Sequence, residues 1–304
     1  MSNRLATEPL FDPAAPLVAS GNLRRRELTS RVAAGSATAG AVLAIGVLGV
    51  VVYTVIKRGG GQLSFGFLTK TPPLFGGSGG GIAPEIVGTL VIVALATVIA
   101  APLGVLVALY LTEFSGPRGG SVIRSALDLM QGLPSIIVAV FIFGLLVAGH
   151  PQSGYAGAAA LAIIMLPLIA RSSQEVILLV PSNLREAAEA LGVGQWRTIL
   201  GVVLPAALSG IVTGVLLAVA RAAGETAPML VLSSIFPINQ FLVNPFSHQA
   251  IPNIPFFIFN LSEQPDPASL TRAWGAALVL LAMILIANFA ARILLARSRR
   301  KLGR

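Results

Sequence analysis

The sequence predicts an all-α integral membrane protein with six transmembrane helices and both termini in the cytoplasm. Hydrophobic residues make up 55% of the 304 residues, charged residues only 11%, and the mean hydropathy is +0.85. In soluble globular domains about a quarter of the residues are charged. The uncharged runs are long enough to cross a hydrocarbon core of roughly 30 Å, which takes about 20 helical residues. Lys and Arg concentrate between alternate runs, which indicates a fixed orientation.

The uncharged runs predict the transmembrane helices one by one. Four runs predict one helix each: 32–56, 86–112, 198–220 and 273–291. The charge-free segment 129–170 is long enough for two more, separated at 149–154 (GHPQSG), where Pro and Gly disfavour a continuous helix. The apolar stretch 198–236 is too long for one span, so we expect a break near Gly224 or Pro228. The first run is too long for a signal-peptide core and is interpreted as a retained anchor.

The distribution of basic residues predicts the orientation. With both termini inside, the inner segments hold sixteen Lys and Arg, Arg221 falls within a span, and the outer segments hold four: Lys57, Arg58, Lys70 and Arg272. The predicted organisation is a cytoplasmic tail 1–31, a first transmembrane helix 32–56, an external Gly/Pro-rich loop 57–85, a five-helix core 86–296 with a cytoplasmic loop 172–200 and an external loop 237–271, and a basic tail 297–304. We interpret the basic tail as an anchor to lipid headgroups.

The sequence lacks the residues that several classes of function require. The chain has no cysteine and therefore no disulfide or thiolate metal site. His150 and His248 stand alone in predicted external loops, which favours exposed turn residues over metal ligands. Ser135 has no visible base and is expected to cap a helix rather than act as a nucleophile. The basic residues lack interleaved aromatics, which disfavours nucleic acid. No phosphate-binding G-x-x-x-x-G-K-[ST] loop is present, so we expect neither ATP hydrolysis nor a cofactor in this chain.

The predicted cytoplasmic loop between the fourth and fifth spans contains a short amphipathic helix, within VPSNLREAAEALGVGQWRTILGVVLPAALSGI. Asn183 can cap this helix, with Glu186 three residues later. The apolar residues share one face: Leu184, Ala187, Ala188 and Leu191. Gly192 and Gly194 are expected to end the helix. Such a small helix has the shape of a peg that fits a groove on a partner.

EAAEALG (186–192), followed by ILGVVLPAALSGI (199–211), resembles the EAA loop of ABC-importer permeases. The resemblance implies the type I, MetI-like permease core. It also implies that this loop is the coupling helix that docks into a cleft on a cytoplasmic ATPase subunit. The coupling residues by this resemblance are Glu186, Ala187, Ala188, Gly192, Leu204 and Pro205.

Four further stretches resemble phosphate-specific permeases: QGLPSIIVAVFIFG (131–144), LPLIARSSQEVILLVPSNLREAAEALG (166–192), ARAAGETAPML (220–230) and RAWGAALVL (272–280). The form GETAP is more similar to the PstA type than to the PstC type. The resemblance implies import of inorganic phosphate across a bacterial inner membrane, with a PstC-type second permease, two copies of an ATP-binding subunit and an external phosphate-binding protein. Another oxyanion or small solute is the alternative cargo.

Arg221 and Glu225 form a charged pair inside a predicted span. A charged residue at the centre of a span costs about 3 kcal/mol, so both must face protein, water or a ligand. They are four residues apart and share a helix face. The resemblance places one pathway arginine at Arg221 and another at Arg171. We therefore predict that Arg221 and Arg171 line the substrate pathway and that Glu225 holds Arg221.

Glu175 is a further candidate for the pathway. It lies four residues after Arg171 and can pair with it, whereas Gln174, where the family usually has an acid, could share only a neutral hydrogen bond. Two alternatives for Arg221 and Glu225 stay open. The pair could lock the fifth span to its neighbours, or it could supply acid–base groups to a membrane-embedded enzyme acting on a lipid. Against the enzyme, the sequence lacks a recognisable set of base, nucleophile and metal ligands.

Overall fold

The computed structural model describes residues 21–73, 79–235 and 249–301, and within them every regular element is a helix. The chain divides after Thr54 into two units. The first described helix, α1 (Gly21–Gly59), begins in the first unit and ends in the second. Its residues from 32 to 56 are mostly apolar, as in a helix that lipid or another subunit covers. It starts eleven residues before the predicted span (21 against 32), while most of the predicted tail 1–31 lies outside the described residues.

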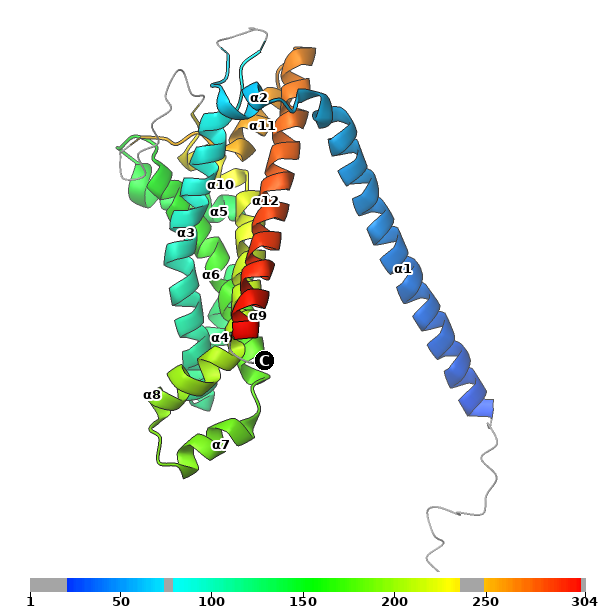
Figure 1. Cartoon of the computed structure of the whole chain (residues 1–304), viewed down its shortest axis with the longest axis vertical. Coiled ribbons are helices and arrows are strands. Elements are labelled where there is room, and N and C mark those ends of the chain that lie inside the picture. The colour runs from blue at the N-terminus through cyan, green and yellow to red at the C-terminus, as the bar shows by residue number, and fades with distance from the viewer. Residues whose placement is uncertain (1–20, 74–78, 236–248, 302–304) are drawn as a thin grey trace, which may run out of the picture. The chain divides into compact units, whose positions relative to one another are not determined.

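The regular elements of the larger unit are helices (Figure 1). In chain order they are η1 (Gly60–Gln62), α2 (Phe65–Thr69), α3 (Ala83–Leu109), η2 (Tyr110–Phe114), α4 (Pro117–Gly132), α5 (Ser135–Ile142), η3 (Phe143–Val147), α6 (Gly154–Leu178), α7 (Ser182–Ala190), α8 (Gln195–Thr198), η4 (Ile199–Val203), α9 (Leu204–Ala223), α10 (Ala227–Leu232), α11 (Ile254–Ser262) and α12 (Pro267–Lys301). Among them, η2, η3 and η4 are single π-helical stretches that continue α3, α5 and α8.

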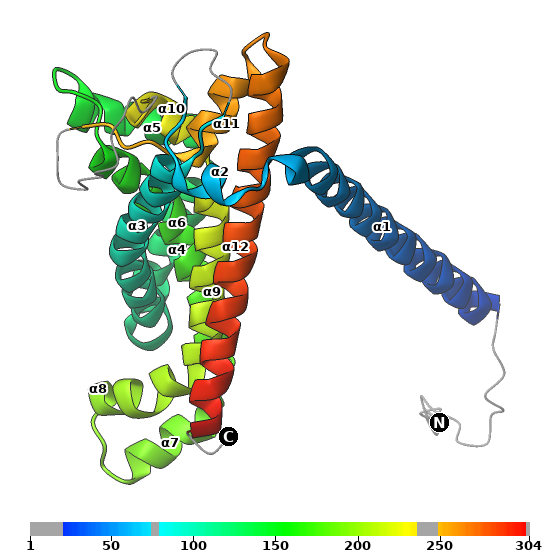
Figure 2. The ribbon, with the colours of Figure 1, turned by 45° about the horizontal axis from the view of Figure 1, so that its top comes forward.

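Long helices pack side by side to form the core of this unit. Helices α3, α6 and α9 share one buried cluster, to which α12 adds partly buried residues. Small residues bring α3 and α6 close together; for example, a Cβ on Gly104 would come within 2.8 Å of Ile169. Lipid tails are as apolar as these side chains, so helices in a membrane associate mainly through close packing of this kind. Figures 1 and 2 show α7 and α8 at one end of these helices and α2 and α11 at the other.

The predicted six spans are reached only if a bent pair counts as the third span, which is therefore not a straight helix. Five described helices are long and apolar enough to cross a membrane, and a bent pair, residues 118–132 and 135–147, makes up to six. The pair is bent by 99° at the break between its two arms. The bend lies at Leu133, whose extended backbone (φ −70°, ψ 129°) is the conformation that a following proline favours. The expectation of one continuous helix in the first half of 129–170 is therefore wrong. The break predicted at 149–154 is confirmed, because α6 begins at Gly154.

The fifth span breaks where Gly224 follows α9. The prediction of a break near Gly224 or Pro228 is confirmed, because residues 224–226 separate α9 from α10. Pro228 lies in the first turn of α10, where its missing N–H removes no intrahelical hydrogen bond. Helix α10 is fixed by Gln152, which donates to the Val231 carbonyl (3.0 Å) and accepts from the Ser234 backbone N–H (3.0 Å).

Candidate functional site

Arg221 projects from the last turn of α9 toward Glu225, which lies in the break before α10. The Arg221 Nε and Glu225 Oε1 atoms are 3.6 Å apart, close enough for an ion pair and too far for a good hydrogen bond. The Arg221 side chain is 62% exposed and that of Glu225 only 16%. Within the described part of the chain, the Arg221 side chain makes no other ion pair or hydrogen bond. Most of its five N–H donors are therefore available to a ligand or to another subunit.

Arg221 lines a cavity of about 230 Å³. The other walls come from the end of α4, the bend, α5 and α6: Met130, Gln131, Leu133, Ser135, Val138, Ile163, Ile164 and Leu168. The bend at Leu133 thus brings the end of α4 and the start of α5 to the same cavity as an arginine about 90 residues later in the chain (221 against 131). The polar side chains on this wall are Gln131, Ser135 and Arg221.

The N-terminus of α5 adds a second positive feature to this cavity. Ser135 is the first helical residue, and Pro134 precedes it with no side-chain cap. The expectation that Ser135 caps the helix is therefore wrong. Backbone N–H groups in the first turn of a helix carry partial positive charge and attract anions. An arginine and a helix start without a side-chain cap on one cavity favour a negatively charged ligand.

Arg171 is held quite differently from Arg221. Its guanidinium pairs with Asp128 of α4, donates to the Arg124 carbonyl (3.1 Å) and approaches Gln174 Oε1 (3.4 Å). Its side chain is 24% exposed, and it is not among the residues that line the Arg221 cavity. These bonds tie α6 to α4.

The pairing of Arg171 with Glu175 is wrong, because Asp128 takes that place and Glu175 is exposed. A signal for Asp128 existed in the sequence. It is the only acidic residue between Glu113 and Glu175. Its proximity to Arg171 depends on how α4 packs against α6, which helical spacing along one segment does not reveal.

The predicted coupling residues divide between two faces of α7. Glu186 and Ala187 are exposed, whereas Ala188 is buried in this chain. The helix starts at Ser182 after Pro181 without a side-chain cap, so the cap predicted at Asn183 is wrong. The other two coupling residues lie at the start of α9, where Leu204 is half-buried and Pro205 is exposed in the first turn.

Gly192 ends α7 as predicted. Its φ of +72° is in the left-handed region. The N–H of Val193 bonds to the Ala188 carbonyl (3.0 Å) and that of Gly192 to the Glu189 carbonyl (2.9 Å), the two bonds of a Schellman motif. A Cβ at Gly192 would meet nothing within 4 Å, so the glycine is needed for its backbone conformation and not for space.

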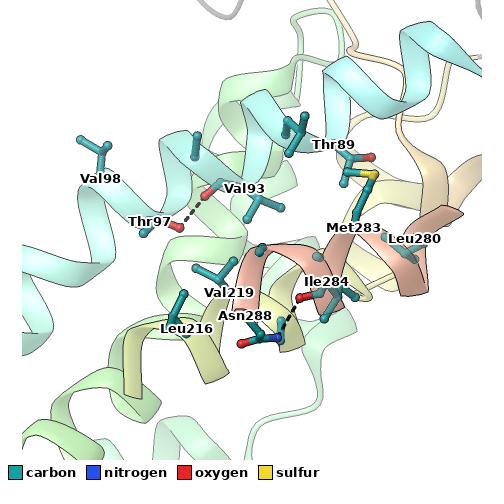
Figure 3. Close-up of a pocket in the computed structure, with 15 residues that line it drawn as sticks. Thr89, Val93, Thr97, Val98, Leu216, Val219, Leu280, Met283, Ile284 and Asn288 are labelled. Carbon is teal, nitrogen blue, oxygen red and sulfur yellow. Dashed lines mark hydrogen bonds between the residues drawn. The ribbon is translucent and has the colours of Figure 1, made fainter. Parts of the chain in front are cut away.

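A larger cavity of about 360 Å³ lies between α3, α9 and α12 and differs in chemistry (Figure 3). Its side chains are almost all aliphatic, and each polar side chain donates to a carbonyl of its own helix. Thr97 donates to the Val93 carbonyl (2.7 Å) and Asn288 to the Ile284 carbonyl (2.9 Å), as Figure 3 shows. No charged residue of the described part of the chain lines it. This cavity suits an apolar chain, and the smaller one suits an anion.

Comparison with known proteins gives consistent matches. Residues 100–300 match the family model of the binding-protein-dependent transport system inner membrane component. The chain is 36% identical over 315 residues to the phosphate transport system permease protein PstA 1 of Mycobacterium tuberculosis (strain ATCC 25618 / H37Rv), with 99% of each chain covered. It is 38% identical over 245 residues to the PstA protein of Haemophilus influenzae, covering 80% of this chain and 85% of the relative.

Solved structures share the fold. A chain of the inward-facing MetNI methionine ABC transporter aligns with a TM-score of 0.55 at 20% identity, covering 71% of this chain and 94% of the other. A chain of a bacterial alginate ABC transporter, in complex with an alginate pentasaccharide-bound periplasmic protein, aligns with a TM-score of 0.58 at 15% identity, covering 89% and 94%. The predicted type I permease fold is confirmed.

Proposed function

Because the chain belongs to the family of binding-protein-dependent transport system inner membrane components, and within it to the PstA phosphate transport permeases, we propose that it carries inorganic phosphate into the cell as one subunit of an ATP-driven importer. It is a multi-pass inner-membrane permease subunit and not an enzyme. ATP hydrolysis belongs to a separate subunit, and an external binding protein delivers the substrate.

The observation that carries the phosphate assignment is the exposed Arg221 guanidinium on a cavity that also holds the α5 N-terminus. A guanidinium presents paired N–H donors that match two oxygens of a phosphate and stays charged at physiological pH. Gln131 and Ser135 can supply further hydrogen bonds. The long contact of 3.6 Å to Glu225 keeps the guanidinium oriented without occupying its donors. The nearby carboxylate also weakens anion binding, so that phosphate can leave.

The same family relationship supports the partners that we propose. The end of the bundle with α7 faces the cytoplasm, together with both termini, and the exposed residues Glu186 and Ala187 dock into one of two ATP-binding subunits. A PstC-type permease covers the face on which Arg221 is exposed, since an arginine facing lipid would cost about 3 kcal/mol or more. Arg171 can join the pathway only in a conformation in which Asp128 releases it.

The test is phosphate uptake in cells that lack only this gene and carry variants of it. Arg221→Gln should lower uptake at least tenfold, because a hydrogen bond to a charged group contributes about 1.5–3 kcal/mol. Glu225→Gln should lower the KM and the maximal rate together, because phosphate is held longer. Arg118→Gln is the matched control, since Arg118 is an exposed arginine of α4 with no ion pair among the described residues.

Purification of the complex completes the test. The assembled complex should be present at wild-type levels in all three variants. Uptake that persists in Arg221→Gln, or that is lost only because the complex fails to assemble, would show that Arg221 and Glu225 are structural. Uptake of sulfate in preference to phosphate by the wild type would assign another oxyanion as the cargo.

A further inference from the structure

Arg185 of α7 points toward the rest of the helix bundle, where its side chain binds three groups at once. Its guanidinium donates to the Glu113 carboxylate in η2 (2.9 Å), to the Val180 carbonyl (2.7 Å) and to the Ile177 carbonyl in α6 (3.2 Å). The side chains of Arg185 and Glu113 are only 23% and 10% exposed. A single guanidinium therefore joins α7 to the end of α3, which η2 continues, and to the end of α6.

The chain after the Gly192 turn returns to the same place. Gln195 of α8 donates to the Glu113 carbonyl (2.9 Å), and the ring of Trp196 lies 4.8 Å from that of Phe114, centroid to centroid. Glu113 and Phe114 are thus held from α7 on one side of the turn and from α8 on the other. Because both attachments converge on η2, the loop has little freedom to rotate about the turn independently of α3.

The contact continues from η2 toward the Arg221 cavity. The end of α3 and the end of α6 share a buried cluster that includes Ala108, Leu109 and Ile177. Leu168, on the wall of the cavity, is nine residues before Ile177 in the same helix, about 13.5 Å at 1.5 Å per residue. A displacement of α7 would therefore reach the cavity wall through one continuous helix.

We propose that Glu113 and Arg185 form a coupling clamp, which makes α7, the end of α3 and the end of α6 move as one rigid body. Movement of the ATP-binding subunit then moves the α6 wall of the Arg221 cavity and does not merely bend the loop. Both are positioning residues, since neither lines that cavity. The clamp rests on the proposed function for its role in transport, whereas its rigidity is a property of this chain.

The functional test uses the full importer in proteoliposomes with the phosphate-loaded binding protein. Glu113→Gln and Arg185→Gln should each lower the stimulation of ATP hydrolysis by the loaded binding protein about tenfold, within the ~5–150-fold range of typical coupling between sites. Arg185→Lys should be intermediate, because an ammonium keeps the charge but lacks the planar fork of donors. Arg197→Gln is the matched control, an exposed arginine of α8 whose side chain makes no hydrogen bond or ion pair among the described residues.

Co-purification separates coupling from docking. The ATP-binding subunit should remain in the complex at wild-type amounts in every variant. Its loss from the Arg185→Gln complex would overturn the proposal, because Arg185 would then act in docking. Normal stimulation in both Glu113→Gln and Arg185→Gln would overturn it as well.

The rigidity test uses the absence of cysteine in this chain. Spin labels on Leu106→Cys in α3 and Ser182→Cys in α7, both exposed positions, report the distance between these helices in the assembled importer. The distance distribution should stay narrow and unchanged between the nucleotide-free and ATP-bound states, and it should broaden in Glu113→Gln. A distribution that shifts with ATP in the otherwise unaltered chain would show that α7 is hinged and that no clamp exists. This result does not depend on which solute is transported, so it separates failure of the clamp from failure of the proposed function.

Discussion

Gly192→Ala measures the free-energy cost of the positive φ in the turn that ends α7. The added methyl group would meet no atom within 4 Å, so its effect comes only from the backbone, which has a φ of +72°. A residue with a Cβ pays about 1–2 kcal/mol in this left-handed region. The two Schellman bonds, from Gly192 and Val193, favour retaining the conformation. Since 1.4 kcal/mol corresponds to a factor of ten, alternative ends of α7 should become roughly 5–30 times more populated.

Gly194→Ala is the matched control for this substitution. Gly194 is two residues away, equally exposed and equally free of close contacts, but its φ is −66°, which any residue adopts. Hydrogen exchange of the Gly192 and Val193 amides should accelerate by the same 5–30-fold in Gly192→Ala, because about 1–2 kcal/mol of strain opens the turn. Phosphate uptake should fall in Gly192→Ala and stay normal in Gly194→Ala. Equal exchange and equal uptake in the two variants would refute the argument from φ.

Two further predictions concern the opposite end of the bundle, near α2 and α11. Glu85 is 1% exposed, and neither carboxylate oxygen has a hydrogen-bond partner among the described residues. Because a buried unpaired carboxylate is destabilising, Glu85→Gln should leave the thermal midpoint of the purified complex unchanged or raise it. A clear decrease would reveal a hidden ion-pair partner. Asp266 caps α12, and the backbone N–H of Ala268, followed by the Ser269 hydroxyl, lowers the pKa of its carboxyl. Its stabilising contribution is therefore complete above the ordinary Asp pKa of about 3.9 and is lost as the pH falls through the lower folded value. At pH 7 the first-turn amides of α12 should exchange faster in Asp266→Ala than in the wild type, after correction for intrinsic rates, and equal exchange would contradict the cap.

The sequence by itself determined the features that depend on local chemistry. A hydrocarbon core forces every backbone polar group to bond within its own segment, so long apolar runs must be helices. The breaks at 149–154 and at Gly224 and the turn at Gly192 also followed from the sequence. Glycine is the residue that most easily leaves a helix or adopts a positive φ. The EAA pattern was likewise visible in the sequence, because all of its residues lie within one short loop.

Only the tertiary structure decided which helix faces meet. Arg171 pairs with Asp128, 43 residues away, and Arg185 with Glu113, 72 residues away. A charged residue on a helix can pair with a residue four positions along the same helix or with a residue on a facing helix. Helical periodicity in the sequence predicts only the pairs within one helix. The same limit applied to the 99° bend at Leu133, which brings Gln131 and Ser135 to Arg221. Hydropathy reports how apolar a segment is and not its direction, so the cavity could be found only after the helices were placed in space.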